Sequence, residues 1–362
     1  MIEYKVHLSA LNRSNYGFVE QILKVLAIVF YCFLTTISQT ISRSFMSLST
    51  PVAFIIFNRP DPTKKVFEAI RQAKPQKLLV IADGPRSDRS GEAEKCTETR
   101  AIIDLVDWDC EVLTNYSSIN LGCKRRVSSG INWVFSQVEE AIILEDDCLP
   151  APSFFQFCQT LLEKYRHDDR ISMISGTTCQ QEQTKTSYSY YFSKYAHIWG
   201  WASWRRAWQE YDVDMKTWPE CKQSNLLQSA FHDIYEQKSW IEIFDNVYAG
   251  KIDTWDYQWL YTCLSQSRLS IEPARNLISN LGFGVDATHT FGESPWSNMP
   301  TYDIWDIEHP KLTIRNCEAD IHTFNNFFGG HHMRQQDRLI SKIKNRIKAR
   351  LRPFKHLIPV SS

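Results

Sequence analysis

The chain has 362 residues, of which 43% are hydrophobic and 23% are charged, and its formal net charge is zero. This composition indicates a globular protein with an ample core, in one large domain or two smaller ones. The 10 Cys show no CxxC pair and no regular spacing, which argues against a zinc site or a disulfide framework and favours a reducing cytosol.

Residues 1–45 contain an apolar run from Val25 to Leu34 that is short of the roughly 20 residues a membrane span requires. Three interpretations of this run are open: it lies upstream of a true translation start at Met46, it is a membrane anchor or signal segment, or it is a core helix. No small-x-small cleavage site follows the run, as a signal peptide would require.

From Pro51 onward, short apolar runs alternate with segments of helical spacing. Because these runs are apolar throughout and lie between helices, they predict an α/β fold with a mostly parallel sheet covered by helices on both faces. The expected strands are 52–57, 77–82, 110–113, 141–144 and 171–175, and the expected helices are 63–72, 93–106 and 125–135. A loop is expected over 180–189, followed by a region to about residue 290 that is rich in Trp, Tyr and Asp.

Polar residues follow three of these strands, at Asn58-Arg59, Asp83-Gly84 and Glu145-Asp146-Asp147. Ligands of such sheets gather beyond the carboxyl ends of the strands. The three strand ends therefore predict one pocket that holds an arginine and several carboxylates.

The triplet Glu145-Asp146-Asp147 stands directly after the buried strand 141–144. A solvated turn or a cap on the following helix is the simplest structural explanation for adjacent acids. At the ligand edge of a sheet, however, adjacent carboxylates repel one another unless a cation neutralises them. Oxygen ligands suit Mn²⁺ or Mg²⁺, which commonly bridge one or two carboxylates to substrate phosphates.

These segments (PVAFIIFNRP, KLLVIADGP and AIILEDDCLPAPSFF) resemble the GT-A fold glycosyltransferases, and more narrowly N-acetylglucosaminyltransferase I and its bacterial relatives. The triplet followed by Pro-x-Phe-Phe is the most specific part, and the resemblance spans about residues 51–290. It implies a Rossmann-like nucleotide-sugar-binding sheet. It also implies a metal-dependent transferase that inverts the configuration of the donor sugar.

The resemblance also assigns roles to the strand-end residues. It implies that Asp147 holds the metal, that Asp146 lies near the ribose and that Glu145 lies near the donor sugar. Arg59 would line the nucleotide pocket, and Asp83 would accept a hydrogen bond from the edge of a uracil-like base. A carboxylate facing an imide N–H favours uracil or thymine over cytosine, which agrees with a UDP-sugar donor.

Three further candidates for donor binding each have a structural alternative. Arg125, near a helix start with Lys124 and Arg126, would contact phosphate, or would lie on a solvated basic face. Trp201, in the segment HIWGWASWRRAW, would contact the sugar, or would belong to a core stripe with Trp204 and Trp208.

His289 follows Asp286 in a loop, SNLGFGVDATHT, that could close over the diphosphate. A lone histidine is more commonly structural, so both interpretations stay open.

The segment IDTWDYQW resembles the family's Trp-Asp segment, which implies that Asp256 is the catalytic base. An inverting transferase needs one carboxylate to take the proton from the attacking acceptor hydroxyl. Asp253 is the rival for this role. The structural alternative is that Asp256 only caps a helix.

Residues 331–362 are strongly basic: nine Lys or Arg and one Asp lie between Arg334 and Lys355. Within them, Leu339, Ile343, Ile347 and Leu351 recur every four residues, which predicts a basic amphipathic helix. Such a helix would lie on an anionic membrane surface or pack on its own domain. Nucleic-acid binding is not expected, because no aromatic residues interleave with the charges.

The predicted organisation is an N-terminal segment (1–45), a nucleotide-sugar-binding half (46–176), an acceptor and catalytic half (177–330) and the basic helix (331–362). The predicted function is transfer of a sugar from a nucleotide-diphospho-sugar to a glycan or lipid-linked acceptor. The predicted location is the cytoplasm, with peripheral attachment to the inner face of the cell membrane as an extension. A non-catalytic glycan-binding or membrane-associated scaffold is the alternative. A sugar-phosphate nucleotidyltransferase ranks third, because FNRPDPTKK after the first strand lacks the glycines of its phosphate loop.

Overall fold

The computed structural model describes residues 24–27, 48–180, 186–231, 233–283 and 295–351. The chain divides into two compact units, Met1–Ser47 and Leu48–Ser362. No helix among the described residues is both long and apolar enough to cross a membrane. The boundaries expected near residues 176 and 330 fall inside the second unit and stay predictions.

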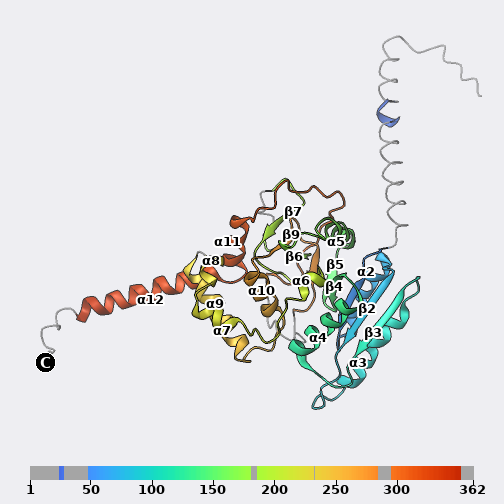
Figure 1. Ribbon diagram of the computed structural model, residues 1–362, viewed down its shortest axis with the longest axis horizontal. Helices are drawn as coiled ribbons and strands as arrows, with labels where there is room; N and C mark the ends of the chain where they lie inside the picture. Colours follow the sequence, from blue (N-terminus) through green and yellow to red (C-terminus); the bar gives the residue numbers. More distant parts are fainter. Residues whose placement is uncertain (1–23, 28–47, 181–185, 232, 284–294, 352–362) are drawn as a thin grey trace, which may run out of the picture. The chain divides into compact units, whose positions relative to one another are not determined.

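An eight-stranded sheet forms the centre of the second unit (Figure 1). Counted across the sheet from one edge, the first four strands are mutually parallel. The next strand, β8, is antiparallel to both of its neighbours. Strands β6 and β9 are parallel to each other, and β7 is antiparallel to β9. The predicted α/β class with a mostly parallel sheet is therefore confirmed. In spatial order the strands are β3 (Glu111–Tyr116), β2 (Lys77–Ala82), β1 (Val52–Ile56), β4 (Glu140–Glu145), β8 (Trp201–Trp204), β6 (Ile171–Ser175), β9 (Leu269–Pro273) and β7 (Tyr190–Ser193).

Helices cover both faces of the sheet. Alternate residues of each central strand point to opposite faces, and both sets are apolar, so each face needs a layer of helices to bury it. The helices are α2 (Pro60–Ala73), α3 (Glu92–Ala101), α4 (Gly122–Gln137), α5 (Ser153–Lys164), α6 (Arg205–Trp208), α7 (Trp218–Gln223), α8 (Leu227–Ala230), α9 (Ile234–Tyr248), α10 (Asp256–Ser265), α11 (Cys317–Asn326) and α12 (Gly330–Leu351). In β1, Val52, Phe54 and Ile56 pack with α2 and α5, whereas Ala53 and Ile55 pack with α4 and α10.

The expected elements match the structure closely in the first half of the chain. Strands 77–82 and 171–175 have the predicted bounds, whereas the strand expected over 110–113 continues to Tyr116. The helix expected over 93–106 ends at Ala101 and continues as a 3-10 turn, Ile102–Leu105. Part of the loop expected over 180–189 lies outside the described residues.

A second apolar cluster lies among helices α7, α9, α10 and α11 and is built largely from aromatic rings. Trp218, Trp240 and Phe244 are at most 1% exposed. Phe244 contacts Trp240 and Trp218 with ring centroids 5.5 and 5.3 Å apart. Some of the aromatic residues between 195 and 261 therefore build a core of their own, whereas others, such as Trp201 and Trp259, pack on the sheet.

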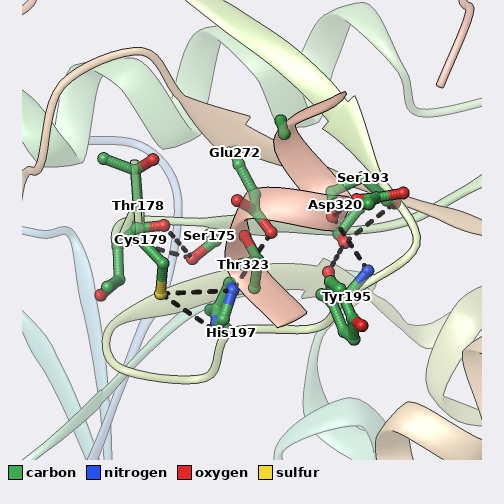
Figure 2. A network of polar contacts seen from close by, with 12 residues as sticks. Ser175, Thr178, Cys179, Ser193, Tyr195, His197, Glu272, Asp320 and Thr323 are labelled. Carbon is green, nitrogen blue, oxygen red and sulfur yellow. Dashed lines mark hydrogen bonds and ion pairs between the residues drawn. The ribbon is translucent and has the colours of Figure 1, made fainter. Parts of the chain in front are cut away.

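A buried network of polar side chains joins β7 and β9 to neighbouring loops (Figure 2). The Tyr191 hydroxyl donates to Glu272 Oε2 at 2.5 Å, and His197 Nε2 lies 3.5 Å from Glu272 Oε1. Burial raises the pKa of Glu272 to about 8 and lowers the pKa of His197 to about 4. Both shifts favour the neutral forms, so the pair stays uncharged near neutral pH.

The raised pKa of Glu272 makes stability depend on pH. Between its ordinary value of 4.5 and about 8, the folded state holds a proton that the unfolded state has lost. The free energy of unfolding therefore falls as the pH rises through this interval. The shift of His197, between about 4 and 6.5, acts in the opposite direction and is absent above pH 6.5. Glu145, whose pKa is also raised to about 8, contributes in the same direction as Glu272, so only a variant of Glu272 separates the two.

We expect Glu272→Gln to make the decline in the free energy of unfolding between about pH 6.5 and 8 shallower by up to about 1.4 kcal/mol per pH unit, the contribution of one carboxyl. The part of the decline that comes from Glu145 stays in the variant. Urea unfolding at several pH values measures the slope. The exposed Glu308→Gln is the control and leaves the slope of the parent protein in place. If the free energy of unfolding fell with pH at the same slope in the parent and in Glu272→Gln, Glu272 would not be the source of this pH dependence.

Candidate active site

The carboxyl ends of β1 and β4 meet in an ion-pair cluster. The Arg59 guanidinium follows β1, and its Nη2 contacts Asp146 Oδ1 and lies 2.9 Å from Asp147 Oδ2. The side chain of Arg59 is 20% exposed, and those of Asp146 and Asp147 are 5% and 13% exposed. The structure thus brings together Arg59, which follows β1, and the carboxylates that follow β4.

Burial beside like charges favours the neutral form of two of these acids. Burial, and then Asp147 and Asp146, raise the pKa of Glu145 to about 8. Burial raises the pKa of Asp146 to about 6, against the opposing effect of Arg59. Glu145 Oε1 is buried and has no hydrogen-bond partner in the part of the chain that the structure describes. One arginine therefore leaves the triplet short of positive charge and of donors.

Asp147 lies under a short two-stranded sheet that pairs β5 (Cys148–Pro150) with β10 (Ile278–Asn280) in antiparallel register. The chain leaving β10 passes close to the carboxylate, and Leu281 N donates to Asp147 O at 2.8 Å. A Cβ atom at Gly282 would lie 2.1 Å from Asp147 Oδ2. Glycine is therefore required at 282 for the backbone to approach the proposed metal ligand this closely.

Asp83, at the end of β2, is held by the start of α4. Its carboxylate accepts from Gly84 N at 2.9 Å, Leu121 N at 2.9 and 3.1 Å, Gly122 N at 3.1 Å and Asn120 Nδ2 at 3.1 Å. Burial raises the pKa of Asp83, and these backbone bonds oppose the shift. A base N–H would have to compete with these donors, so a role in base recognition stays a prediction.

The basic residues at the start of α4 separate into different environments. Arg126 is buried, and its guanidinium donates to the backbone oxygens of Ala82 and Asn115. Arg126 therefore ties α4 to the ends of β2 and β3. Arg125 is exposed, so its side chain is accessible to a phosphate.

Asp256 begins α10 and is half-buried. The Thr254 hydroxyl donates to its Oδ1, and the helix N-terminus favours a negative charge there. Asp256 is among the charges that raise the pKa of Glu145, after burial, Asp147 and Asp146, so it lies within electrostatic range of the triplet. The structure thus brings the predicted base to the acidic triplet from a segment more than 100 residues further along the chain.

The flanking residue Asp253 is exposed and approaches the start of α4. Its Oδ2 lies 3.1 Å from the position of a Cβ at Gly122, whose φ is +76°. Both rivals for the role of base therefore lie near this end of the sheet. Asp256 is the less exposed of the two.

Sequence reasoning missed Cys123, which lies among the carboxylates. Burial, and then Glu145, Asp256, Asp253 and Asp83, raise the pKa of its thiol, so Cys123 stays a neutral thiol. The pKa of this one residue thus registers four acids from three separate parts of the chain. The signal in the sequence was its position directly after Leu121-Gly122, between the second strand end and the basic residues.

Trp201 lies in β8 and is fully buried. Its ring contacts those of Trp255 and Trp259 with centroids 5.7 and 5.8 Å apart. A direct contact between Trp201 and a sugar is therefore incorrect for this structure. Trp201 lies in one core cluster with Trp208, whereas Trp204 lies in another, so the three residues are buried but do not form one stripe. The other loop candidates, His289 and Asp286, lie outside the described residues.

The donor set at Asp147 is compatible with Mg²⁺ or Mn²⁺. Among residues 48–180, 186–231, 233–283 and 295–351, no group of three or more His, Cys, Asp or Glu is arranged to hold a metal ion. These cations, however, commonly bind through one or two carboxylates while phosphates and waters supply the remaining oxygens. Asp147 supplies such a carboxylate: its Oδ2 accepts from Arg59 and borders the backbone at Gly282.

Arg59 makes the cluster sensitive to the loss of one charge. Replacing it by Met leaves buried Asp146 beside Glu145 and Asp147 without their cation. Breaking a buried pair costs about 3–5 kcal/mol. We expect a loss of that order in the free energy of unfolding, measured by urea denaturation.

The matched control is Arg71→Met, which breaks the exposed pair between Arg71 and Asp107 on the same helix, α2. We expect little change there, because solvent screens exposed pairs. Equal effects of the two substitutions would contradict a special role for Arg59.

The sequence matches no protein-family model and no curated protein. Among solved structures, the mannosyltransferase PcManGT from Pyrobaculum calidifontis, in complex with GDP-Man and Mn²⁺, is 12% identical with a TM-score of 0.34. The match covers 47% of this chain and 49% of that chain, so this chain spans about half of its length.

Two further solved structures show likenesses of similar degree. Mouse xyloside xylosyltransferase 1 is 10% identical with a TM-score of 0.29, over 60% of this chain and 82% of that chain. The inositol-1-phosphate CTP transferase from T. maritima is 9% identical with a TM-score of 0.33, over 70% and 95%. Weak structural neighbours are thus glycosyltransferases and nucleotidyltransferases. Similarities of this degree assign no activity to the chain.

Proposed function

We propose that the protein is a metal-dependent, inverting glycosyltransferase of GT-A type that uses a UDP-sugar. It would transfer the sugar to a hydroxyl of a glycan or a lipid-linked acceptor. The observation that carries this proposal is the meeting of Arg59, Glu145, Asp146 and Asp147 at the ends of β1 and β4 with Asp256 at the start of α10.

The acidic triplet suits a donor that brings both positive charge and hydroxyl groups. Glu145 Oε1 is buried and unpartnered within the described residues, so a sugar hydroxyl that donates to it would satisfy it. Asp146 is fixed by Arg59 and would accept from the ribose. Asp147 would hold the Mn²⁺ or Mg²⁺ ion that binds with the diphosphate.

Such an ion would supply stabilisation of the negative charge that develops on the departing diphosphate. Arg125 is exposed near the start of α4 and would contact phosphate. Arg59 keeps Asp146 and Asp147 in position before the donor arrives.

Asp256 would act as the base. Its Oδ1 is oriented by the Thr254 hydroxyl and its backbone by α10. As the acceptor oxygen attacks the anomeric carbon, the bond from that carbon to the diphosphate breaks and Asp256 takes the hydroxyl proton. A single displacement inverts the anomeric configuration and needs no covalent intermediate.

We expect the purified full-length protein to be stabilised by UDP in the presence of Mn²⁺ and much less by UDP alone. A ligand at about 100-fold its Kd stabilises a fold by roughly 2.7 kcal/mol. Thermal-shift titrations with UDP, dTDP, GDP and CMP, each with and without Mn²⁺, measure this. They also test whether the site selects uracil over the other nucleobases, the selection attributed to Asp83.

Asp147→Ala should abolish the metal-dependent part of the shift, while the exposed Asp109→Ala keeps it. Absence of a shift with every nucleotide would favour the non-catalytic scaffold. A shift with CMP or GDP alone would retain nucleotide binding and overturn the uridine assignment.

We expect Asp256→Asn to lower the rate of sugar transfer by about 10²–10⁴-fold, the usual contribution of a general base. Release of UDP from a panel of UDP-sugars with candidate glycan acceptors measures the rate. UDP–Mn²⁺ binding should persist in this variant, which separates loss of the base from loss of the donor site. A larger loss in Asp253→Asn than in Asp256→Asn would transfer the role of base to Asp253.

A further inference from the structure

The first turns of α12 are fastened to the rest of the unit. Arg334 pairs with Asp233, the N-cap residue of α9, and its guanidinium lies 5.5 Å from the centroid of the Tyr235 ring. The Tyr235 hydroxyl donates to Asp337 Oδ2 at 2.8 Å. These contacts hold the first turns of α12 against the start of α9.

Beyond Asp337 the helix is exposed on all sides as far as its side chains are described, to residue 347. Its apolar residues share this exposure: Leu339 is 59% exposed, Ile340 48%, Ile343 55% and Ile347 51%. Residues 339, 343 and 347 lie four apart and hence on one face of the helix. The prediction that this helix is amphipathic is consistent with these positions. Among the residues that the structure describes, none covers the apolar face at 339, 343 and 347.

The positive charge of α12 limits which kinds of molecule can cover its apolar face. Gly330–Leu351 contains seven Lys or Arg and one Asp. Two such helices would bring like charges together along a paired apolar seam, which disfavours a second copy of this chain as the partner. An anionic lipid surface complements both features, because a basic amphipathic helix lies in the interfacial plane with its apolar face in the acyl boundary.

We propose that α12 binds an anionic lipid bilayer in the plane of its surface, through Leu339, Ile343 and Ile347, with Arg338, Lys342, Lys344 and Arg346 against the headgroups. This surface is separate from the residues assigned to sugar transfer, and the proposal does not depend on them. It gives the protein a surface that would hold it at a membrane.

Co-sedimentation of the full-length protein with vesicles of phosphatidylglycerol and phosphatidylcholine tests the proposal. We expect binding to 30% phosphatidylglycerol vesicles and not to pure phosphatidylcholine. The triple substitution L339S/I343S/I347S should weaken it at least tenfold, and K342Q/K344Q/R346Q by roughly fivefold per charge at low salt. Leu312→Ser with Ile314→Ser, both 67% exposed and distant in sequence from α12, is the control.

Every variant keeps the apolar run Val25–Leu34, so the difference from the parent protein isolates α12. Urea unfolding of each variant confirms that the fold is retained. Equal binding of parent and triple variant, or binding that ignores phosphatidylglycerol, would overturn the proposal. So would a dimer in light scattering that only the apolar substitutions dissociate, since the apolar face would then serve a second copy of the chain.

Discussion

The structure depends on how three adjacent carboxylates are accommodated at the end of a buried strand. Glu145, Asp146 and Asp147 follow the apolar residues of β4 and are held largely out of water. Arg59 supplies one positive charge to them, and the raised pKa of Glu145 and of Asp146 shows that this charge does not fully compensate burial and repulsion. Such an arrangement is costly in a protein that has no use for it, and it is suited to a ligand that brings cations and hydroxyls.

The same constraint extends to the backbone around the triplet. A Cβ at Gly282 would lie 2.1 Å from Asp147 Oδ2, and one at Gly122 would lie 3.1 Å from Asp253 Oδ2. Two glycines from distant parts of the chain thus bring main chain close to carboxylates. A side chain at either position would crowd the neighbouring carboxylate.

The sequence predicted the parallel half of the sheet well, because continuous apolar runs ended by polar residues are a local signal. It also predicted that Arg59 meets the triplet, since carboxyl ends of parallel strands share one edge. It did not predict that Asp83 is occupied by backbone donors of the following loop, or that Cys123 lies among the acids. Those facts depend on how the loop before α4 turns back on the strand, which no periodicity encodes.

Trp201 shows how a residue outside the ligand's reach can still fix the site. It pairs with Ile143 in β4, two residues before Glu145, and its ring stacks on Trp255, the neighbour of Asp256. One buried side chain therefore connects the strand that carries the acids to the residue that precedes Asp256. Trp259, also within 5.8 Å of the Trp201 ring, holds the next turn of α10 in the same core. The proposed sugar transfer would depend on carboxylates held in a fixed geometry, and a packed aromatic core maintains such a geometry better than a solvated loop.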